Sequence, residues 1–310
     1  MNTLHFKYAL EIERTGSITH AAENLFISQP SLSKAIKDLE DSIGFEIFER
    51  TAKGMVLTKK GAEFMVYARS IVDKLKKIEN LANNDSDIQS FNISIPRGSY
   101  IADAFTKFVS ELNTDKDIDV NIQETNSIQA INNVVEGRFN LAIIRYQTTY
   151  ENYFLDYLEE RNLCSDLIWE FEYLVLLSKN HPLSAAKEIK YRDLSKFIEI
   201  VHGDTAIPYI SSNEVKKDTE RSSGKRIYVY ERSNQFDLLS NIYTTYMWVS
   251  PIPKRYLGLY NLVQRRCHVA NHKYKDLLIF NKGYKLSTLD HKFINKLYES
   301  KNEVAFIEYT

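Results

Sequence analysis

Apolar residues recur at helical spacing in the first part of the chain, and the clearest case predicts a helix over residues 28–44. Ser28 is suited to cap its first turn, and Gly44 is suited to end it. The outward positions of its first two turns carry amide, hydroxyl and ammonium groups but no carboxylate. A helix with an apolar back and a donor-rich front fits a DNA major groove. The apolar stripe consists of Leu32, Ile36, Leu39 and Ile43.

Two shorter helical patterns precede this segment, over residues 3–14 and 18–25. The second is joined to 28–44 by a tight turn, which is the arrangement of a helix-turn-helix. Apolar runs within 45–58 then flank Lys53-Gly54 and predict a β-hairpin, or wing, beside it. A helical hairpin in a bundle that binds no DNA is the alternative that this pattern leaves open.

A long helix is predicted over residues 59–81, with Thr58 as its cap. Its apolar residues follow the alternating spacing of three and four that is typical of a coiled-coil seam, so we expect a dimer. The alternative is an amphipathic helix that packs on its own domain. The seam consists of Phe64, Ala68, Ile71, Leu75, Ile78 and Ala82.

The polar segment 83–87 is the clearest domain boundary, because strand and helix patterns alternate after it. Strand, helix, strand, helix and strand in succession imply parallel βαβ units and an α/β domain. We expect strands at 91–95, 118–124, 139–145, 169–178, 196–201, 227–230, 248–249 and 277–280, and helices at 100–112, 128–136, 207–217, 235–245 and 290–300.

Length and charge restrict the function classes. The 310 residues predict two or three domains, and the net charge of −1 means that any DNA contact comes from a local basic patch. No apolar run approaches the length of a membrane span, and the N-terminus lacks the pattern of a secretory signal. Two cysteines form no disulfide framework, so the expected location is the cytoplasm.

Several segments in register resemble the N-terminal region of LysR-type transcriptional regulators: 17–25, 28–36, Phe48-Glu49-Arg50 and 57–61, together with Leu39-Glu40 and Gly44. The resemblance implies an α/β multidomain protein with an N-terminal winged helix-turn-helix, a linker helix that dimerises, and a two-lobed effector domain of periplasmic-binding-protein type. Two departures stand out. Lys34 replaces an arginine common in the family, and bulky residues in 243–251 replace a Gly-x-Gly turn.

The expected domains follow from this layout: 1–58 for DNA binding, 59–88 for the linker helix and hinge, and 89–310 for effector binding. Lobe I would comprise 89–162 and 269–310, and lobe II 163–268. The resemblance implies double-stranded promoter DNA as partner, a small-molecule effector between the lobes, and a homotetramer built on the linker-helix dimer. RNA polymerase is a further candidate partner, whereas a membrane, a cofactor and an enzymatic activity are not expected.

The DNA contacts are assigned by charge and position. Side chains near the start of helix 28–44 are expected at base edges, whereas basic groups elsewhere are expected at phosphates. The base-edge set is Gln29, Pro30, Ser31, Ser33 and Lys34, and the phosphate set is Ser17, Lys37, Arg50 and Lys53.

Effector contacts are expected where strands of an open α/β sheet end and helix N-termini begin. Hydroxyls, amides and free N–H groups at these places favour a carboxylate or another small anion. The alternative is that the same residues serve as helix caps. The candidates are Ser99, Tyr100, Thr125, Asn126, Arg145, His202, Gly203, Thr205, Ser233 and Asn234.

Cys164 and Cys267 fall at the two predicted passages between lobes, so neighbouring thiols and a redox-responsive regulator are an alternative to the small-molecule effector. Two buried, unreactive thiols are the simpler interpretation. A solute-binding module without DNA function is a rival from another class, as is an enzyme on a two-lobed scaffold. The missing secretory signal opposes the first, and the lack of a coherent catalytic or metal-binding set opposes the second.

Overall fold

The computed structural model describes residues 2–51, 54–82, 88–203, 224–230, 232–269 and 272–307. The chain divides into two compact units, Met1–Ser86 and Asp87–Thr310, at the polar segment predicted as a boundary. The helix expected over 207–217 lies outside the described residues. Within the described ranges, no helix is both long and apolar enough to cross a membrane.

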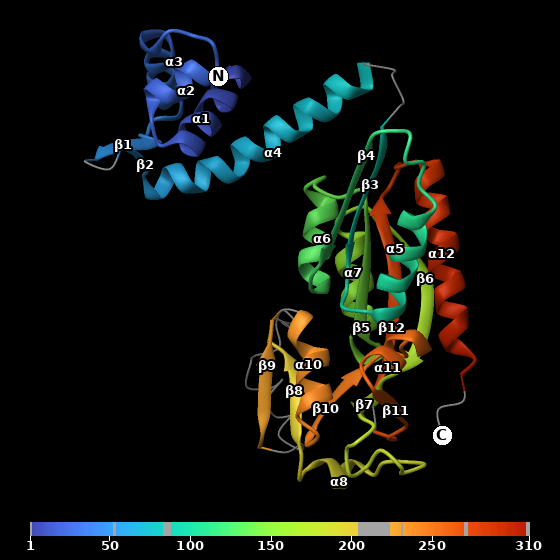
Figure 1. Ribbon diagram of the computed structural model, residues 1–310. Helices are drawn as coiled ribbons and strands as arrows, with labels where there is room; N and C mark the ends of the chain where they lie inside the picture. The colour runs from blue at the N-terminus through green and yellow to red at the C-terminus, as the bar shows by residue number, and fades with distance from the viewer. Residues whose placement is uncertain are drawn as a thin grey trace. The chain divides into compact units, whose positions relative to one another are not determined.

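The N-terminal unit is a winged helix-turn-helix followed by a long helix (Figure 1). The predicted caps of the third helix are confirmed, because the Ser28 hydroxyl accepts the Ser31 N–H at 3.3 Å and Gly44 adopts a φ of 79°. Thr58 also caps as predicted, accepting the Gly61 N–H at 2.9 Å. The elements are α1 (Thr3–Thr15), α2 (Ile18–Asn24), α3 (Gln29–Ile43), β1 (Phe48–Thr51), β2 (Gly54–Leu57) and α4 (Lys59–Ala82).

Helix α4 divides its apolar residues between its own unit and the surface. Met65, Ala68 and Val72 are buried in the core that also contains the apolar faces of α1 and α3. Ile71 and Ile78 are 37% and 60% exposed. The first half of α4 therefore packs on its own unit, as the alternative interpretation held, because the three short helices need a fourth face to close their core. Of the residues in the seam expected for a dimer, Ile71 and Ile78 are therefore not covered by this packing.

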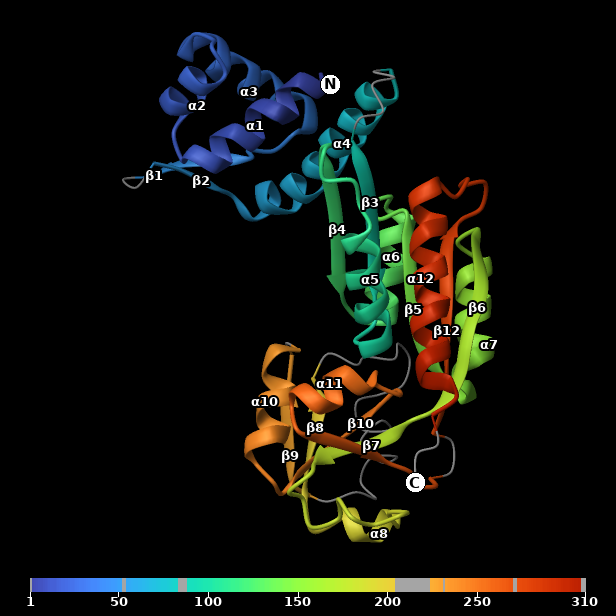
Figure 2. The ribbon, with the colours of Figure 1, turned by 45° about the vertical axis from the view of Figure 1, so that its right-hand side comes forward.

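Lobe I of the second unit is a five-stranded sheet with helices on both faces (Figure 2). The strand order is β4-β3-β5-β12-β6, and β3 runs parallel to both β4 and β5, as the βαβ prediction required. Helices α5 and α12 cover one face, and α6 and α7 cover the other. The elements are β3 (Gln89–Ile95), α5 (Ser99–Ser110), β4 (Ile118–Glu124), α6 (Ser127–Val135), β5 (Leu141–Gln147), η1 (Thr148–Tyr150), α7 (Glu151–Glu159), β6 (Leu163–Glu172), β12 (Lys273–Asn281) and α12 (Thr288–Ala305).

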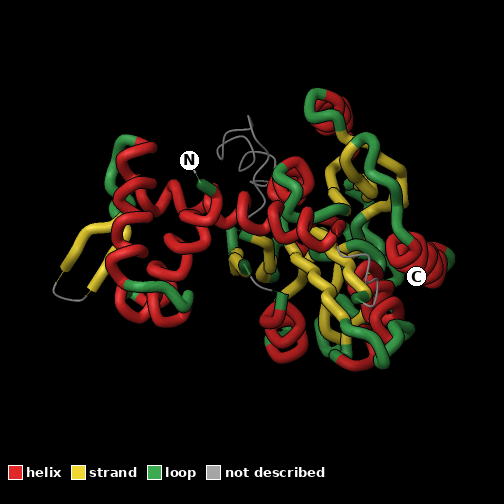
Figure 3. Tube along the Cα trace, turned by 90° about the horizontal axis from the view of Figure 1, so that it is seen from above, coloured by secondary structure: helices red, strands yellow, loops and turns green. Residues whose placement is uncertain are grey.

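Lobe II is a second five-stranded sheet, in the order β11-β7-β10-β8-β9. Strands β10, β8 and β9 are parallel, whereas β7 and β11 pair antiparallel with their neighbours. Figure 3 distinguishes the strands, in yellow, from the helices, in red, along the Cα trace. The elements are β7 (Leu174–Ser178), α8 (Tyr191–Leu194), β8 (Ile198–His202), β9 (Arg226–Val229), α10 (Ser233–Asn241), β10 (Thr245–Val249), α11 (Lys254–Leu259) and β11 (Leu262–Arg265).

The passage from lobe I to lobe II comes later than the sequence suggested. Strand β6 pairs with β12 along its length and so belongs to lobe I, which moves the passage from residue 163 to Tyr173. The N–H of Tyr173 donates to the carbonyl of His272 at 3.2 Å, so the outgoing and returning chains lie side by side there. The apolar pattern of a strand identifies the strand but not the sheet that receives it.

Candidate functional site

The first turns of α3 carry polar side chains, most of which have no hydrogen-bond or ion-pair partner elsewhere in the described chain. Gln29, Lys34 and Lys37 are exposed and have no side-chain partner among the described residues. The hydroxyls of Ser28 and Ser31 hydrogen-bond each other at 2.7 Å. The amide of Gln29 and the ammonium groups of Lys34 and Lys37 can therefore meet a ligand without breaking an internal side-chain bond. Of the other predicted residues on this helix, Pro30 is exposed and Ser33 is half-buried.

The wing is attached to α3 by Glu40. Its Oε1 accepts the N–H of Ile47 at 2.7 Å and the N–H of Phe48 at 3.1 Å, so β1 begins at a fixed point relative to α3. Arg50 lies exposed in β1, where a phosphate could reach it. Lys53, expected beside it, lies outside the described residues.

Ser17, expected at a phosphate, is half-buried and caps α2 by accepting the His20 N–H at 3.4 Å. It therefore has a structural role that is independent of DNA. A phosphate contact from its hydroxyl stays a prediction.

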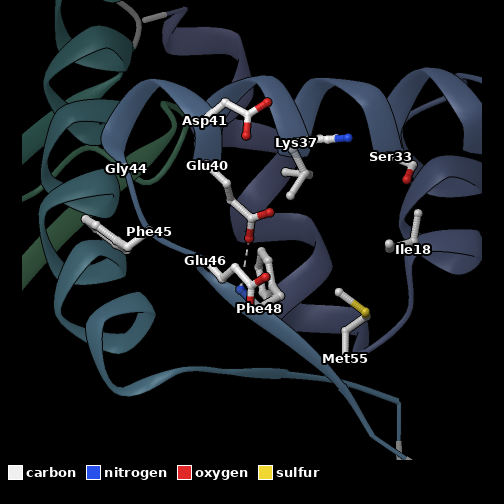
Figure 4. Close-up of a pocket in the computed structure, with 11 residues that line it drawn as sticks. Ile18, Ser33, Lys37, Glu40, Asp41, Gly44, Phe45, Glu46, Phe48 and Met55 are labelled. Atoms are coloured by element: carbon white, nitrogen blue, oxygen red, sulfur yellow. Dashed lines mark hydrogen bonds between the residues drawn. The ribbon is translucent and has the colours of Figure 1, made fainter.

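A surface groove of about 620 Å³ lies between the second half of α3 and the wing (Figure 4). Asp41 and Glu46 line it with Glu40, and among the described residues Lys37 is the one cation that lines it. Carboxylates repel phosphates, so the groove itself disfavours an anionic ligand. The apolar lining comes from Ile18, Ile36, Phe45, Phe48 and Met55.

The second polar cluster joins β5, β12 and the first turn of α5 in lobe I. Arg145 and Asp276 form a two-fold hydrogen-bonded ion pair at 2.7 and 2.6 Å, and their side chains are 6% and 0% exposed. The Tyr100 hydroxyl also donates to Asp276. Burial opposes the charge of Arg145, but Asp276 and then Tyr173 raise its pKa above the ordinary value; burial raises the pKa of Tyr100. Gly98 permits this arrangement, since a Cβ there would lie 3.0 Å from the guanidinium.

Arginines also join lobe I to lobe II. Arg232, just before α10, donates to the Ser99 hydroxyl at 2.8 Å and pairs with Glu124 at the end of β4. Arg97 donates to the carbonyl of Tyr230 at 2.6 Å. We name the contact of Arg232, Glu124 and Ser99 the interlobe contact. Its two charged side chains keep 17% and 27% exposure, so water reaches this pair, unlike the buried pair of Arg145.

The structure separates the predicted effector residues into different roles. Ser99 belongs to the interlobe contact, whereas Tyr100 hydrogen-bonds to Asp276 and Arg145 forms an ion pair with it. Asn126 caps α6 by accepting the Gln129 N–H at 2.9 Å, as the capping alternative held. Thr125, His202 and Gly203 are half-buried, Asn234 is exposed, the Ser233 side chain is not described, and Thr205 lies outside the described residues.

Sequence reasoning missed Glu124, Arg232 and Asp276. Glu124 was predicted as the last residue of a strand, so the rule that ligands bind at strand ends could have included it. Arg232 and Asp276 carried no comparable signal, because each meets its partner across more than a hundred residues of chain.

The two cysteines lie far apart. Cys164 is near the start of β6, and the eight residues to Glu172 span about 26 Å at the rise of a strand. Cys267 is buried in lobe II in a cluster with Val175, beyond the end of β6. The expected proximity is therefore wrong, since a disulfide needs Cα atoms within about 7 Å. Burial raises the pKa of Cys267 to about 11, which disfavours the reactive thiolate.

Residues 4–62 match the model of the bacterial regulatory helix-turn-helix protein, lysR family. The chain is 36% identical over 90 residues, 29% of its length and 30% of the relative's, to the RuBisCO operon transcriptional regulator of Allochromatium vinosum. It is 28% identical over 201 residues, 64% of its length and 59% of the relative's, to the HTH-type transcriptional regulator CysB of Haemophilus influenzae. These matches thus span less than two thirds of the curated relatives.

The fold of the whole chain has a counterpart among solved structures. Full-length CbnR, in its complex with target DNA, aligns with 97% of this chain and 100% of its own at a TM-score of 0.63, with 16% identity. The winged helix-turn-helix, the long helix and the two α/β sheets thus occur together in both proteins. The match to the lysR-family model thus covers the helix-turn-helix and wing of this chain, and the likeness to CbnR extends over the fold of both units.

Proposed function

We propose that this protein is a transcriptional regulator that binds promoter DNA in a sequence-specific manner. The observation that carries the proposal is the row of exposed, unpaired donors on the first turns of α3. Gln29 and Lys34 would reach base edges, whereas Arg50 on the wing would hold a phosphate. The solved complex of CbnR with its target DNA supports this use of the fold. The acidic groove behind Lys37 limits the contact to the N-terminal half of the helix.

The second half of α4 supports assembly into dimers. Ile78 is 60% exposed and Ile71 is 37% exposed on a helix whose first half is already packed. A second copy of the same helix would cover these side chains and place two α3 helices on one DNA molecule. A homotetramer would follow if a further surface of the second unit also self-associates.

The second unit would respond to a small anion at the interlobe contact. Arg232 already holds one carboxylate, that of Glu124, and also donates to the Ser99 hydroxyl. A carboxylate or phosphate of an effector could take the place of Glu124, because the Arg232 guanidinium suits either group. Releasing Glu124 would weaken one bond between the lobes, which couples binding to the lobe arrangement.

A mobility-shift titration tests the DNA-binding proposal. The full chain is mixed with DNA from upstream of its gene at low salt, where phosphate contacts are strongest. We expect a retarded complex. Unlabelled competitor DNA that carries the same site should reduce the amount of this complex. Failure to retard any fragment at low salt would refute the proposal.

Thermal-shift measurements test the effector proposal. Small carboxylates and inorganic phosphate are added singly to the wild type and to Glu124→Gln. Without its resident carboxylate, the variant should be stabilised more strongly by an anion than the wild type. Glu136→Gln is the matched control, because Glu136 pairs with Arg138 on the surface. Equal responses of all three proteins would contradict the proposed exchange.

A further inference from the structure

Phe26 combines an exposed aromatic side chain with a left-handed backbone conformation, and neither feature stabilises the fold. It lies in the turn between α2 and α3, and its side chain is 95% exposed. Its φ is 55°, in the left-handed region. Among the described residues, the other non-glycine residues with positive φ are Asn162 and Asn261. Asparagine tolerates this region through local hydrogen bonds, whereas for phenylalanine it costs about 1–2 kcal/mol.

Hydrogen bonds of the turn fix the direction in which the ring leaves the backbone. The Phe26 N–H donates to the Glu23 carbonyl at 3.1 Å, and the Ile27 N–H donates to the Ala22 carbonyl at 3.1 Å. The Ile27 side chain packs against the core of the unit. Its neighbours on either side, Phe26 and Ser28, are both exposed. The ring therefore stands beside the capping residue of α3, next to the proposed DNA-reading turn.

We propose that Phe26 is a DNA contact at the edge of the site read by α3. Its ring would pack on a deoxyribose and, where the sequence offers one, on the C5 methyl of a thymine, which is an apolar contact suited to phenylalanine. This inference rests on the proposed function, because the surface that covers the ring is DNA. The contact neutralises no phosphate, so it adds affinity without adding salt dependence.

Phe26→Asn tests the contact without adding backbone strain. Asparagine accepts the left-handed conformation, so the variant should unfold in urea at the same concentration as the wild type or a higher one. We expect its Kd for the promoter fragment to rise about tenfold, which corresponds to about 1.4 kcal/mol. The slope of log Kd against log salt should stay unchanged. Phe26→Tyr keeps the ring and should bind within about twofold of the wild type.

Phe306→Asn is the matched control, because Phe306 is 85% exposed in the second unit. Its DNA affinity should equal that of the wild type. A second set of titrations uses promoter fragments in which one thymine at a time is replaced by deoxyuridine. If the ring meets a methyl group, one replacement should weaken the wild type and leave Phe26→Asn unaffected.

The outcomes separate the two proposals. Wild-type affinity for Phe26→Asn would overturn the role of Phe26 and leave the DNA-binding proposal intact, as would a Phe26→Tyr variant as weak as Phe26→Asn. A changed salt slope would also overturn it, since the residue would then act through phosphate contacts. Failure of the wild type itself to bind DNA would instead overturn the function on which the inference rests.

Discussion

The first turns of α3 and the interlobe contact both carry cationic and neutral polar side chains. Among the described residues, most of these side chains are unpaired on α3, whereas those at the interlobe contact are hydrogen-bonded. On α3, the Gln29 amide and the Lys34 ammonium are exposed and have no partner within the described chain. At the interlobe contact, Arg232 and Ser99 are already bound to Glu124 or to each other. A ligand of α3 forms new hydrogen bonds with these free donors. A ligand of the interlobe contact must instead replace hydrogen bonds that the protein already makes. Exchange contributes little net affinity but changes the protein's own contacts, which suits a regulatory site.

The largest expected effect concerns Asp276, which is fully buried and accepts hydrogen bonds from Arg145 and Tyr100. Asp276→Asn leaves Arg145 buried without its anion, and breaking such a pair costs about 3–5 kcal/mol. Urea unfolding of the full chain should show the loss. Glu136→Gln, at a surface pair, should change stability by less than about 0.5 kcal/mol. Similar small losses in both variants would show that the buried pair is not a structural requirement.

Acid should destabilise the second unit through His181. Burial lowers its pKa to about 4, and its Nδ1 accepts the Leu183 N–H at 3.0 Å. The unfolded chain takes up the proton near pH 6.5, so stability should fall from there down to about pH 4 and be unaffected above pH 7. The loss should reach about 3 kcal/mol, since one pKa unit is worth about 1.4 kcal/mol.

His181→Asn keeps a hydrogen-bond acceptor without a titrating ring, so it is the control for this pH dependence. Its stability curve should be flatter between pH 6.5 and 4. Curves of the same steepness in both proteins would assign the acid sensitivity to other groups.

Base readout at α3 should be the next effect in size. Gln29→Ala should lose about 2 kcal/mol for the preferred operator and less for variants of it, because an amide that pairs with a base is lost. Arg50→Ala should weaken all sequences alike and lower the salt slope by about one. Binding titrations on an operator series distinguish the two, and uniform losses in both variants would remove Gln29 from the base-reading set.

The smallest effect is expected at Glu124. Glu124→Gln should change the free energy of unfolding by less than about 1 kcal/mol, because water reaches both partners of the ion pair. Urea unfolding without added anion measures this. A loss as large as that of Asp276→Asn would remove the distinction between a fixed pair and an exchangeable one.

Local features of the first unit could be predicted from the sequence because their partners are close along the chain. Ser28 and Gly44 act within one helix, and the spacing of Leu32, Ile36 and Leu39 depends on helical geometry alone. The same local logic leaves α4 undecided, because the spacing of an apolar seam does not say which surface covers it. Met65 and Val72 pack on their own unit, because three short helices leave that side of their core open.

The sequence by itself thus determined the helices of the first unit, the wing, the parallel βαβ connections of lobe I and the polar front of α3. Only the tertiary structure decided that β6 stays in lobe I, that Cys164 and Cys267 are far apart, and that Asp276 and Glu124 satisfy the arginines near the predicted effector residues. The reason is physical. Caps and apolar spacing arise within a few residues, whereas burial and charge pairing depend on which distant segments the folded chain brings into contact.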